Sequence, residues 1–227
     1  MNVAGIIQAR TGSTRLPGKV CMTLAGVPFI QRVIRAVKAA TMVQEVILAV
    51  PESDYGVLEP CARAEDCRII GGPEDDVLER YLMAARLAGC DTIVRATGDN
   101  PFVCPEHIDT ILRFHFSQDA DLSHWLGIPI GTGVEVIRRD VLETAGREAL
   151  LPEEREHVTP WIYAHRELYR VEEPVLLKDP GVRLTVDTAE DYARASRLAE
   201  YFHQRNMLPV RLDQVLEVYR ADPGIFR

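Results

Sequence analysis

Short apolar segments alternate with stretches of helical periodicity through the first half of the chain, and this order constrains the fold more than any other feature. The pattern predicts strands at residues 3–9, 45–50, 67–70 and 92–97, and helices at residues 28–40, 53–65, 74–88 and 105–116. Strands that alternate with helices of this length need right-handed crossovers and assemble into a mostly parallel sheet with helices on both faces. The sequence therefore predicts a doubly wound α/β fold, in which ligands bind beyond the carboxyl ends of the strands.

The middle of the chain, residues 121–169, interrupts this alternation like an insertion. The elements predicted from there on are a strand at residues 133–138, a helix ending near Ala149, a helix at residues 153–165, a strand at residues 183–186 and a helix from Thr188. Thr188 and Asp191 form a capping pair at the start of the last helix. Because no repeat or linker separates these parts, we expect one domain over residues 1–227.

The composition excludes several classes of protein. A formal net charge of -8 argues against a general nucleic-acid binder, since binding to the phosphate backbone depends on an excess of Lys and Arg. No run approaches the roughly 18 consecutive apolar residues of a membrane span, and Arg10 and Arg15 interrupt the apolar start of the chain, unlike a signal peptide. We therefore expect a cytoplasmic protein without membrane contact. Five scattered cysteines without paired C-x-x-C motifs predict neither disulfides nor a zinc site.

The loop from Gln8 to Lys19, directly after the first strand, concentrates positive charge in this acidic chain. Its three cations precede every acidic residue and are Arg10, Arg15 and Lys19. Gly12 and Gly18 permit close backbone approach, so that N–H groups, hydroxyls and cations can surround a polyphosphate. The loop is not a Walker A motif, because Val20 stands where Ser or Thr would hold magnesium. A solvated surface loop is the alternative, but the position after the first strand favours phosphate binding.

Two aspartates follow predicted strands at their carboxyl ends. Asp99 lies just past the strand at residues 92–97, and Asp187 directly follows the strand at residues 183–186. Such carboxylates can hold Mg²⁺, which prefers one or two protein carboxylates and completes its shell with waters and substrate phosphates. The alternatives are a turn cap before Pro101 for Asp99 and a favourable helix-dipole position for Asp187. If both strand ends face one crevice, the two carboxylates can share the metal.

Residues 6–20, which read IIQARTGSTRLPGKV, resemble the signature of the cytidylyltransferases that activate sugar acids, such as the acylneuraminate and 3-deoxy-manno-octulosonate enzymes. The resemblance is closest to the SpsF-like group of spore-coat-polysaccharide biosynthesis. It spans nearly the whole chain. Its further motifs are GPEDDVLERY at residues 72–81, TGDNP at 97–101, EHVTP at 156–160 and RLTVDTAED at 183–191.

The resemblance implies a nucleotide-diphospho-sugar-transferase-like fold, CTP as donor, Mg²⁺ as cofactor and pyrophosphate as by-product. It implies a nucleotide-binding loop in which Gln8 and Ala9 take part and in which the triphosphate is held by Arg10, Gly12, Ser13, Arg15 and Lys19. Asp99 and Asp187 would hold the metal. Asp75 and Asp76 would lie near the base or ribose, although an acidic first helical turn explains them equally well.

The resemblance assigns the small-molecule acceptor to residues outside the phosphate loop. Asn100, Glu135 and His157 are its candidate contacts, although a lone histidine on a helix is more often structural. Residues 121–169 are the expected acceptor and dimerisation segment, and a homodimer is expected. The sequence does not name the acceptor.

We expect an acceptor oxygen to attack the α-phosphorus of CTP in line, with Arg15, Lys19 and Asp99 as the catalytic residues. Charge stabilisation of this kind contributes several kcal/mol in comparable sites. Two alternatives remain open. A guanylyl- or uridylyltransferase acting on a sugar 1-phosphate would use the same phosphate grip, and a non-catalytic nucleotide-binding subunit would need the loop but hardly both aspartates.

Overall fold

A seven-stranded mixed sheet forms the centre of the computed structural model, which describes residues 2–176 and 181–226. In the order β5-β4-β1-β6-β8-β7-β9, its strands are β5 (Arg68–Gly72), β4 (Glu45–Pro51), β1 (Val3–Gln8), β6 (Thr92–Thr97), β8 (Glu135–Arg138), β7 (Leu122–His124) and β9 (Val171–Glu172). Neighbouring strands are parallel except at β8, which is antiparallel to β6 and β7. The strand order reverses beside β1, because the chain runs from β1 outward to β5 and then returns to β6.

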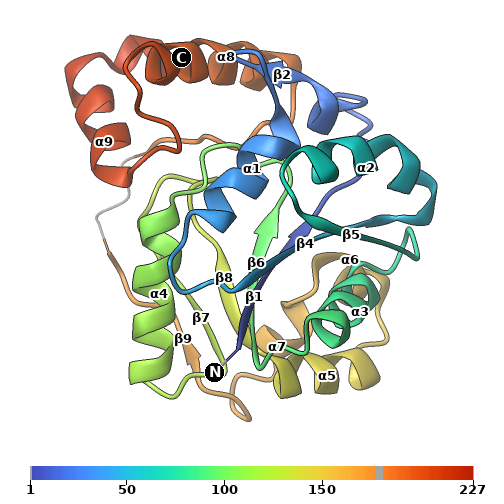
Figure 1. Ribbon diagram of the computed structural model, residues 1–227. Coiled ribbons are helices and arrows are strands. Elements are labelled where there is room, and N and C mark those ends of the chain that lie inside the picture. Colours follow the sequence, from blue (N-terminus) through green and yellow to red (C-terminus); the bar gives the residue numbers. More distant parts are fainter. Residues whose placement is uncertain (1, 177–180, 227) are drawn as a thin grey trace.

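Helices cover both faces of the sheet (Figure 1). One face carries α1 (Phe29–Lys38), α2 (Tyr55–Ala64) and α4 (Pro105–Ser117), and the other carries α3 (Val77–Ala88), α5 (Arg139–Glu148), α6 (Pro152–His157) and α7 (Pro160–Ala164). The predicted doubly wound α/β fold is confirmed. None of the helices in the described ranges is long and apolar enough to cross a membrane.

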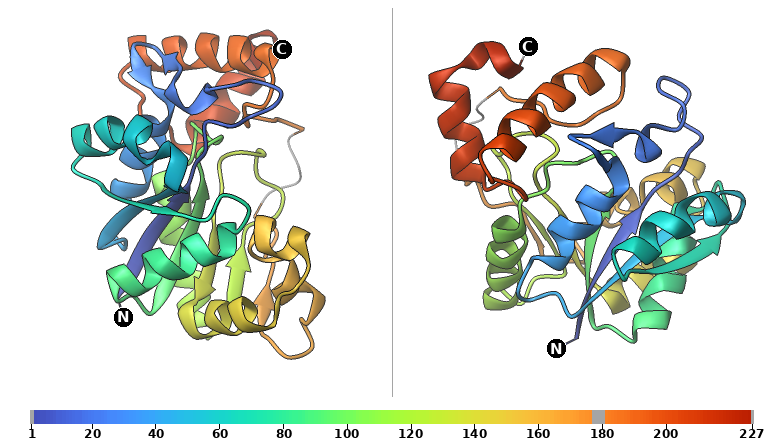
Figure 2. Two further views of the ribbon diagram at one scale, coloured as in Figure 1. Left: turned by 90° about the vertical axis from the view of Figure 1, so that its right-hand side faces the viewer. Right: turned by 45° about the horizontal axis from the view of Figure 1, so that its top comes forward.

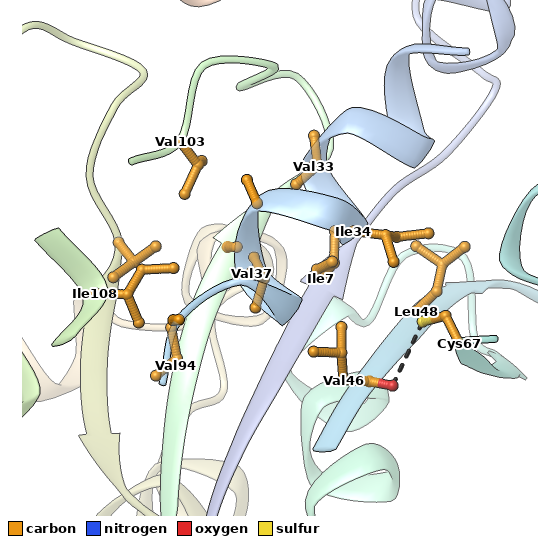
Figure 3. Close-up of a cluster of buried hydrophobic side chains, with 14 of the residues drawn as sticks. Ile7, Val33, Ile34, Val37, Val46, Leu48, Cys67, Val94, Val103 and Ile108 are labelled. Atoms are coloured by element: carbon orange, nitrogen blue, oxygen red, sulfur yellow. Dashed lines mark hydrogen bonds between the residues drawn. The ribbon is translucent and has the colours of Figure 1, made fainter. Parts of the chain in front are cut away.

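The central strands bury both of their faces, which explains why they read as continuous apolar runs. In β4, Val46 and Leu48 pack under α1, whereas Ile47 packs on the opposite face against α3. Figure 3 shows the first of these clusters, where Val33 and Val37 of α1 lie over the sheet. Alternate side chains of one strand therefore hold the two helical layers together.

A third apolar cluster lies at the carboxyl edge of the sheet, where the C-terminal helices α8 (Ala189–Gln204) and α9 (Leu212–Ala221) pack. It joins Phe202 of α8 to Phe102 after β6 and to Leu24 in the hairpin of β2 (Thr23–Leu24) and β3 (Val27–Pro28). Figures 1 and 2 show α8 beside β2. The cluster ties the end of the chain to the loops that follow β1 and β6.

Two predicted elements differ from those observed. The prediction of a strand at residues 183–186 is wrong. Arg183 makes an isolated bridge to Ile130, and the apolar residues beside it pack into the third cluster. The helix predicted at residues 153–165 is divided into α6 and α7. Val158 interrupts it with a φ of +75°, and Pro160, which has no N–H, begins the second helix.

The helix predicted from Thr188 is observed as α8. The Thr188 hydroxyl accepts a hydrogen bond from the N–H of Asp191 over 3.2 Å, and the Asp191 carboxylate accepts one from the N–H of Thr188 over 3.0 Å. This reciprocal capping fixes the start of the helix two residues after Val186 and so fixes the position of Asp187.

Candidate functional site

A cleft of about 440 Å³ opens at the carboxyl ends of β1 and β6, beside the point where the strand order reverses. Residues 9–20 after β1 and residues 98–99 after β6 form much of its wall, and side chains from α3 and α6 complete it together with Asp187. Open α/β sheets bind ligands at this location.

The loop after β1 is held in shape around Thr11. The N–H and the hydroxyl of Thr11 both donate to the Asp54 carboxylate, over 2.7 and 2.6 Å. The carbonyl oxygen of Thr11 accepts hydrogen bonds from the N–H groups of Ser13 and Gly18, over 2.8 and 2.9 Å. Gly18 has a φ of +68°, a conformation that favours glycine. The backbone path of the loop is therefore fixed by hydrogen bonds inside the loop and by those to Asp54, which directly precedes α2.

Gly98 allows the ends of β1 and β6 to approach closely. Its N–H donates to the carbonyl oxygen of Gln8 over 2.7 Å. A Cβ atom at position 98 would lie 2.9 Å from the Cβ of Ala9 and 3.0 Å from the Gln8 oxygen, which is too close for a side chain. Any other residue would force the two strand ends apart and change the floor of the cleft.

Lys19 and Asp187 form the centre of an ionic network in the cleft. The Lys19 ammonium lies 3.0 Å from Asp187 Oδ1 and 3.7 Å from Asp99 Oδ2, and it also donates to the Val186 carbonyl oxygen over 2.8 Å. Arg15 and Arg183 approach the same Asp187 carboxylate within 3.2 and 2.8 Å. Three cations thus share one half-buried carboxylate.

This network changes the acidity of Asp187. Burial favours the neutral acid, but the hydrogen bond from Lys19 and the charges of Lys19, Arg15 and Arg183 outweigh it and lower the pKa of Asp187. The carboxylate therefore stays ionised, and the surrounding cations exceed its charge. An anionic ligand entering the cleft meets surplus positive charge.

Asp99 and Asp187 are two carboxylates of the cleft that could hold a divalent cation together. Both carboxylates face the ammonium of Lys19, so one small cation can be reached by both. Mg²⁺ accepts such a pair and takes its other ligands from water and substrate phosphates. The donor chemistry of the site fits this metal. Asp99 is the less engaged carboxylate, because its side chain is 32% exposed and its contact with Lys19 is long.

Three side chains of the cleft wall have buried polar atoms without hydrogen-bond partners among the described residues. They are Oε1 of Gln8, Nε of Arg80 and Nε of Arg95. Arg80 is 1% exposed, donates to the carbonyl oxygens of Pro73 and Glu74 over 2.7 and 2.9 Å, and has a pKa lowered by burial. Buried unpaired polar atoms cost about 1–3 kcal/mol each, so a polar ligand here would stabilise the protein.

A second polar cluster lies behind the cleft on β6 and β8. Arg95 donates to Glu135 Oε2 over 2.7 Å, and Tyr163 donates to Glu135 Oε1 over 3.0 Å. Burial lowers the pKa of Arg95, but the charge and hydrogen bond of Glu135 outweigh burial and raise it. Burial and the charge of Glu135 raise the pKa of Tyr163. Arg95 is therefore a permanent cation paired with a carboxylate.

The cleft gathers most of the residues singled out from the sequence. Those that line it are Gln8, Ala9, Arg10, Gly12, Ser13, Arg15, Lys19, Asp99, His157 and Asp187. His157 ends α6 beside Glu156, whose carboxylate pairs with Arg10 at 3.2 Å. Asn100 and Glu135 instead line a neighbouring cavity.

Asp75 and Asp76 do not line the cleft. Asp75 is exposed, and Asp76 caps α3 by accepting from the Glu79 N–H over 2.8 Å. The Asp76 carboxylate also accepts from Arg155 Nε over 2.9 Å, which ties α3 to α6. The structure thus supports the helix-start interpretation of Asp76. A position of Asp75 and Asp76 near the base or ribose stays a prediction.

Sequence reasoning missed Arg80, Arg95 and Asp54 as parts of the site. Arg80 and Arg95 had a visible signal, because each is a charged residue in an otherwise apolar pattern, one on the inner face of a helix and the other within a buried strand. Asp54 had no such signal, since its contact with Thr11 joins two loops distant in sequence.

Comparison with known proteins agrees with this geometry. A family model described as cytidylyltransferase matches residues 4–220. The spore coat polysaccharide biosynthesis protein SpsF of Bacillus subtilis is 36% identical over 88% of this chain and 87% of its own length. A 3-deoxy-manno-octulosonate cytidylyltransferase of Acidobacterium capsulatum is 36% identical over 49% of this chain and 45% of its own. The structure of a cytidylyltransferase from Leptospira borgpetersenii superposes with a TM-score of 0.92 at 27% identity, covering 100% of this chain and 97% of that one.

Proposed function

This chain belongs to the cytidylyltransferase family, and from that premise we propose that it transfers CMP from CTP to a small sugar acid with release of pyrophosphate. The observation that carries the proposal is the convergence of Arg15 and Lys19 with Asp99 and Asp187 at the carboxyl ends of β1 and β6. This arrangement offers cations for a triphosphate and carboxylates for its metal in one cleft.

The proposed reaction is an in-line displacement at the α-phosphorus. An oxygen of the acceptor forms a new bond to the α-phosphorus, and the bond from that phosphorus to the oxygen bridging to the β-phosphate breaks. Pyrophosphate leaves with the electron pair of the broken bond. If the attacking group is a hydroxyl, its proton passes to solvent or to a nearby base, for which His157 on the cleft wall is the candidate.

The chain's own residues act mainly by positioning and by charge. Lys19 and Arg15 face the cleft and would pair with the β- and γ-phosphates as charge develops on the leaving group. Asp99 and Asp187 would hold Mg²⁺, which neutralises phosphate charge and polarises the reacting phosphorus when bound. Gly12, Thr14 and Arg15 lie in the same wall, and their backbone N–H groups can donate to phosphate oxygens.

The buried side of the cleft suits a nucleoside. Gln8 Oε1 and Arg80 Nε, an acceptor and a donor without partners in the described chain, lie on this wall with the apolar Val77. The edge of a pyrimidine such as cytosine presents donors and acceptors next to an apolar ring. We assign the base to this side and the phosphates to Lys19.

The relatives suggest where the product is used. SpsF is named for spore coat polysaccharide biosynthesis, so we propose that the activated sugar feeds the synthesis of a surface polysaccharide or glycoconjugate. We also propose that the protein acts as a homodimer, with residues 121–169 contributing to the acceptor site and to the contact between copies.

A pyrophosphate-release assay with CTP, UTP, GTP and ATP tests the proposal. Each nucleotide is combined with sugar acids and with sugar 1-phosphates, with and without Mg²⁺. We expect release with CTP and a sugar acid, dependent on Mg²⁺. Release with GTP or UTP and a sugar 1-phosphate would establish the alternative transferase, and tight nucleotide binding without release from any pair would establish a binding subunit.

A further inference from the structure

Asp54 lies behind the loop that follows β1, outside the nucleotide cleft. It ends the short 3₁₀ helix η2 (Glu52–Asp54) between β4 and α2, and it is buried and does not line the cleft. Its Oδ2 accepts a hydrogen bond from the N–H of Thr11 over 2.7 Å, and its Oδ1 accepts one from the Thr11 hydroxyl over 2.6 Å. Both oxygens of this carboxylate therefore bind a single residue of the loop.

Thr11 faces away from the cleft, unlike its neighbours. The other members of residues 8–15 line the cleft, whereas the Thr11 side chain turns back to Asp54. The Thr11 carbonyl oxygen in turn accepts hydrogen bonds from the N–H groups of Ser13 and Gly18, over 2.8 and 2.9 Å. Thr11 thus connects Asp54 to both ends of the segment that carries the phosphate-facing groups, residues 12–19.

The charge of Asp54 stands in a costly place. Burial of a carboxylate is unfavourable unless hydrogen bonds compensate it, and a negative charge behind a cleft for anions repels the ligand. Two features offset this cost. Hydrogen bonds to a charged acceptor are roughly twice as strong as neutral ones, and Asp54 is the N-cap residue of α2, where the helix dipole favours negative charge. Its side chain makes no capping hydrogen bond to α2, so its hydrogen bonds serve the loop.

The chain uses the same arrangement a second time, away from the cleft. Asp109 of α4 is also buried, and its Oδ2 accepts hydrogen bonds from the N–H and the hydroxyl of Thr41 over 3.0 and 2.8 Å. Its Oδ1 accepts one from the N–H of Met42 over 2.9 Å. Thr41 lies between α1 and β4 and does not line the cleft. Of these two buried aspartates, Asp54 is the one that fixes a loop of the cleft.

Building on the proposed function, we propose that Asp54 is a positioning residue of the nucleotide site, which holds Thr11 from behind so that residues 12–19 meet the triphosphate in a preset geometry. It acts through Thr11 and does not touch the ligand. Donors and cations that are already in place need no rearrangement when the ligand binds. Release of Thr11 therefore weakens the grip on phosphates and leaves the base side of the cleft unchanged.

Titration calorimetry in EDTA, with inorganic tripolyphosphate and cytidine as separate probes, tests this role. Asp54→Ala should lower the affinity for tripolyphosphate about tenfold, or about 1.4 kcal/mol, and leave that for cytidine unchanged. In Asp54→Asn the amide oxygen can accept from the Thr11 N–H and the amide NH₂ can donate to the Thr11 hydroxyl, so tripolyphosphate affinity should stay within about threefold of the unaltered chain. Normal tripolyphosphate binding by Asp54→Ala, or a loss in Asp54→Asn as large as that in Asp54→Ala, overturns the proposal.

Asp109→Ala is the matched control, because it removes an equally buried carboxylate from another threonine. Urea unfolding should show a comparable loss of stability in the two alanine variants, while Asp109→Ala keeps the tripolyphosphate affinity of the unaltered chain. If Asp109→Ala loses as much affinity as Asp54→Ala, the effect is a general loss of stability and the positioning role is refuted.

Changes at Thr11 show whether Asp54 acts through this residue. Thr11→Ser keeps the hydroxyl and should keep tripolyphosphate affinity, whereas Thr11→Val removes it and should lower the affinity about threefold. The double variant Asp54→Ala/Thr11→Val should bind tripolyphosphate no more weakly than Asp54→Ala alone, because the contact is already lost. Additive losses would mean that the two residues act independently, against the proposal.

Pyrophosphate release by the unaltered chain separates this proposal from the proposed function. If CTP supports release but Asp54→Ala binds tripolyphosphate normally, the positioning role alone fails. If tripolyphosphate binding depends on Asp54 but no nucleotide supports release, the proposed function fails and the positioning role stands. If the unaltered chain binds neither CTP nor tripolyphosphate, both fail.

Discussion

The ammonium of Lys19 lies 3.0 Å from the carboxylate of Asp187, although 168 positions separate the two residues in the chain. Lys19 comes from the loop after the first strand, and Asp187 precedes the last long helices. Their contact joins the proposed phosphate-binding wall to one of the two carboxylates proposed for the metal. The loss of either residue therefore affects both charge and structure.

Replacing Lys19 by Met is expected to lower kcat for pyrophosphate release by about 10²–10³, since a preorganised charge in a water-excluded site is worth several kcal/mol. The side chain of Met has similar length, and circular dichroism should remain unchanged. Lys38→Met is the matched control, because Lys38 ends α1 away from the cleft and, among the described residues, donates to the carbonyl oxygens of Glu65 and Asp66, which follow α2. A Lys19→Met protein with normal kcat would contradict the role of this ammonium.

The two aspartates should respond differently to conversion to Asn. Asp187→Asn removes the shared counter-ion of Lys19, Arg15 and Arg183, so the free energy of unfolding should fall by about 2 kcal/mol. Asp99→Asn should change it by less than about 0.5 kcal/mol, because the ion pair of that carboxylate among the described residues is a long one, 3.7 Å to Lys19. Both changes should abolish Mg²⁺-dependent pyrophosphate release.

Urea unfolding and Mg²⁺ titration of the release assay measure these two effects. An Asp99→Asn protein that is stable and still responds to Mg²⁺ would remove Asp99 from the metal site. Equal destabilisation by both changes would show that the network around Lys19 does not depend chiefly on Asp187.

Arg15→Ala should lower the affinity for CTP about tenfold, or about 1.4 kcal/mol, at low salt. The Arg15 side chain is 64% exposed, so its attraction for phosphates is screened by ions and the difference from the unaltered protein should shrink at high salt. Titration calorimetry at two salt concentrations measures both quantities. Arg113→Ala changes an exposed residue of α4 away from the cleft, and it should leave the affinity for CTP unchanged at either salt concentration.

Stability should depend on pH through His115. Burial lowers the pKa of His115 to about 4, from 6.5, and its Nδ1 lies 3.0 Å from the Ser123 hydroxyl in the folded chain. In the unfolded chain the imidazole takes up a proton below about pH 6.5, whereas in the folded chain it does so only below about pH 4. Protons therefore favour the unfolded state, and stability is lost as the pH falls through this window.

His115→Asn isolates the contribution of this histidine. When the pH is lowered from 7 to 5, the unaltered protein should lose about 2 kcal/mol more of its free energy of unfolding than the variant does. Urea unfolding at the two pH values measures it. A difference that stays constant would mean that His115 titrates normally in the folded chain.

The parallel half of the fold could be read from the sequence, because its strands and helices are local patterns that repeat four times. The strand predicted at residues 92–97 is observed as β6 with the same bounds. The reversed direction of β8 could not be predicted, since it depends on pairing between β6 and a segment some 40 residues later. The short strands β7 and β9 and the helix α9 also lacked a clear local pattern.

The site residues also divide into those that a local sequence pattern reveals and those that only long-range packing brings together. Residues within the loop after β1 were identified by their local density of glycine and positive charge, and the cleft contains them. Glu135 and Asn100 were predicted as substrate contacts, but only the folded chain shows that they line a separate cavity next to the cleft. Partners such as Asp54 for Thr11 arise from packing of distant loops, which no local pattern encodes.

The span of the contact between Lys19 and Asp187 has a consequence for synthesis of the protein. A ribosome that has released the first 150 residues has delivered every strand from β1 to β8, yet the chain still lacks Asp187 and the helices that cover the carboxyl edge. Chains fold from the N-terminus as they emerge, and contacts of long sequence separation form last. The nascent chain therefore acquires this ion pair only after Asp187 has left the ribosome, so the proposed nucleotide binding would report that the carboxyl edge of the sheet has been covered.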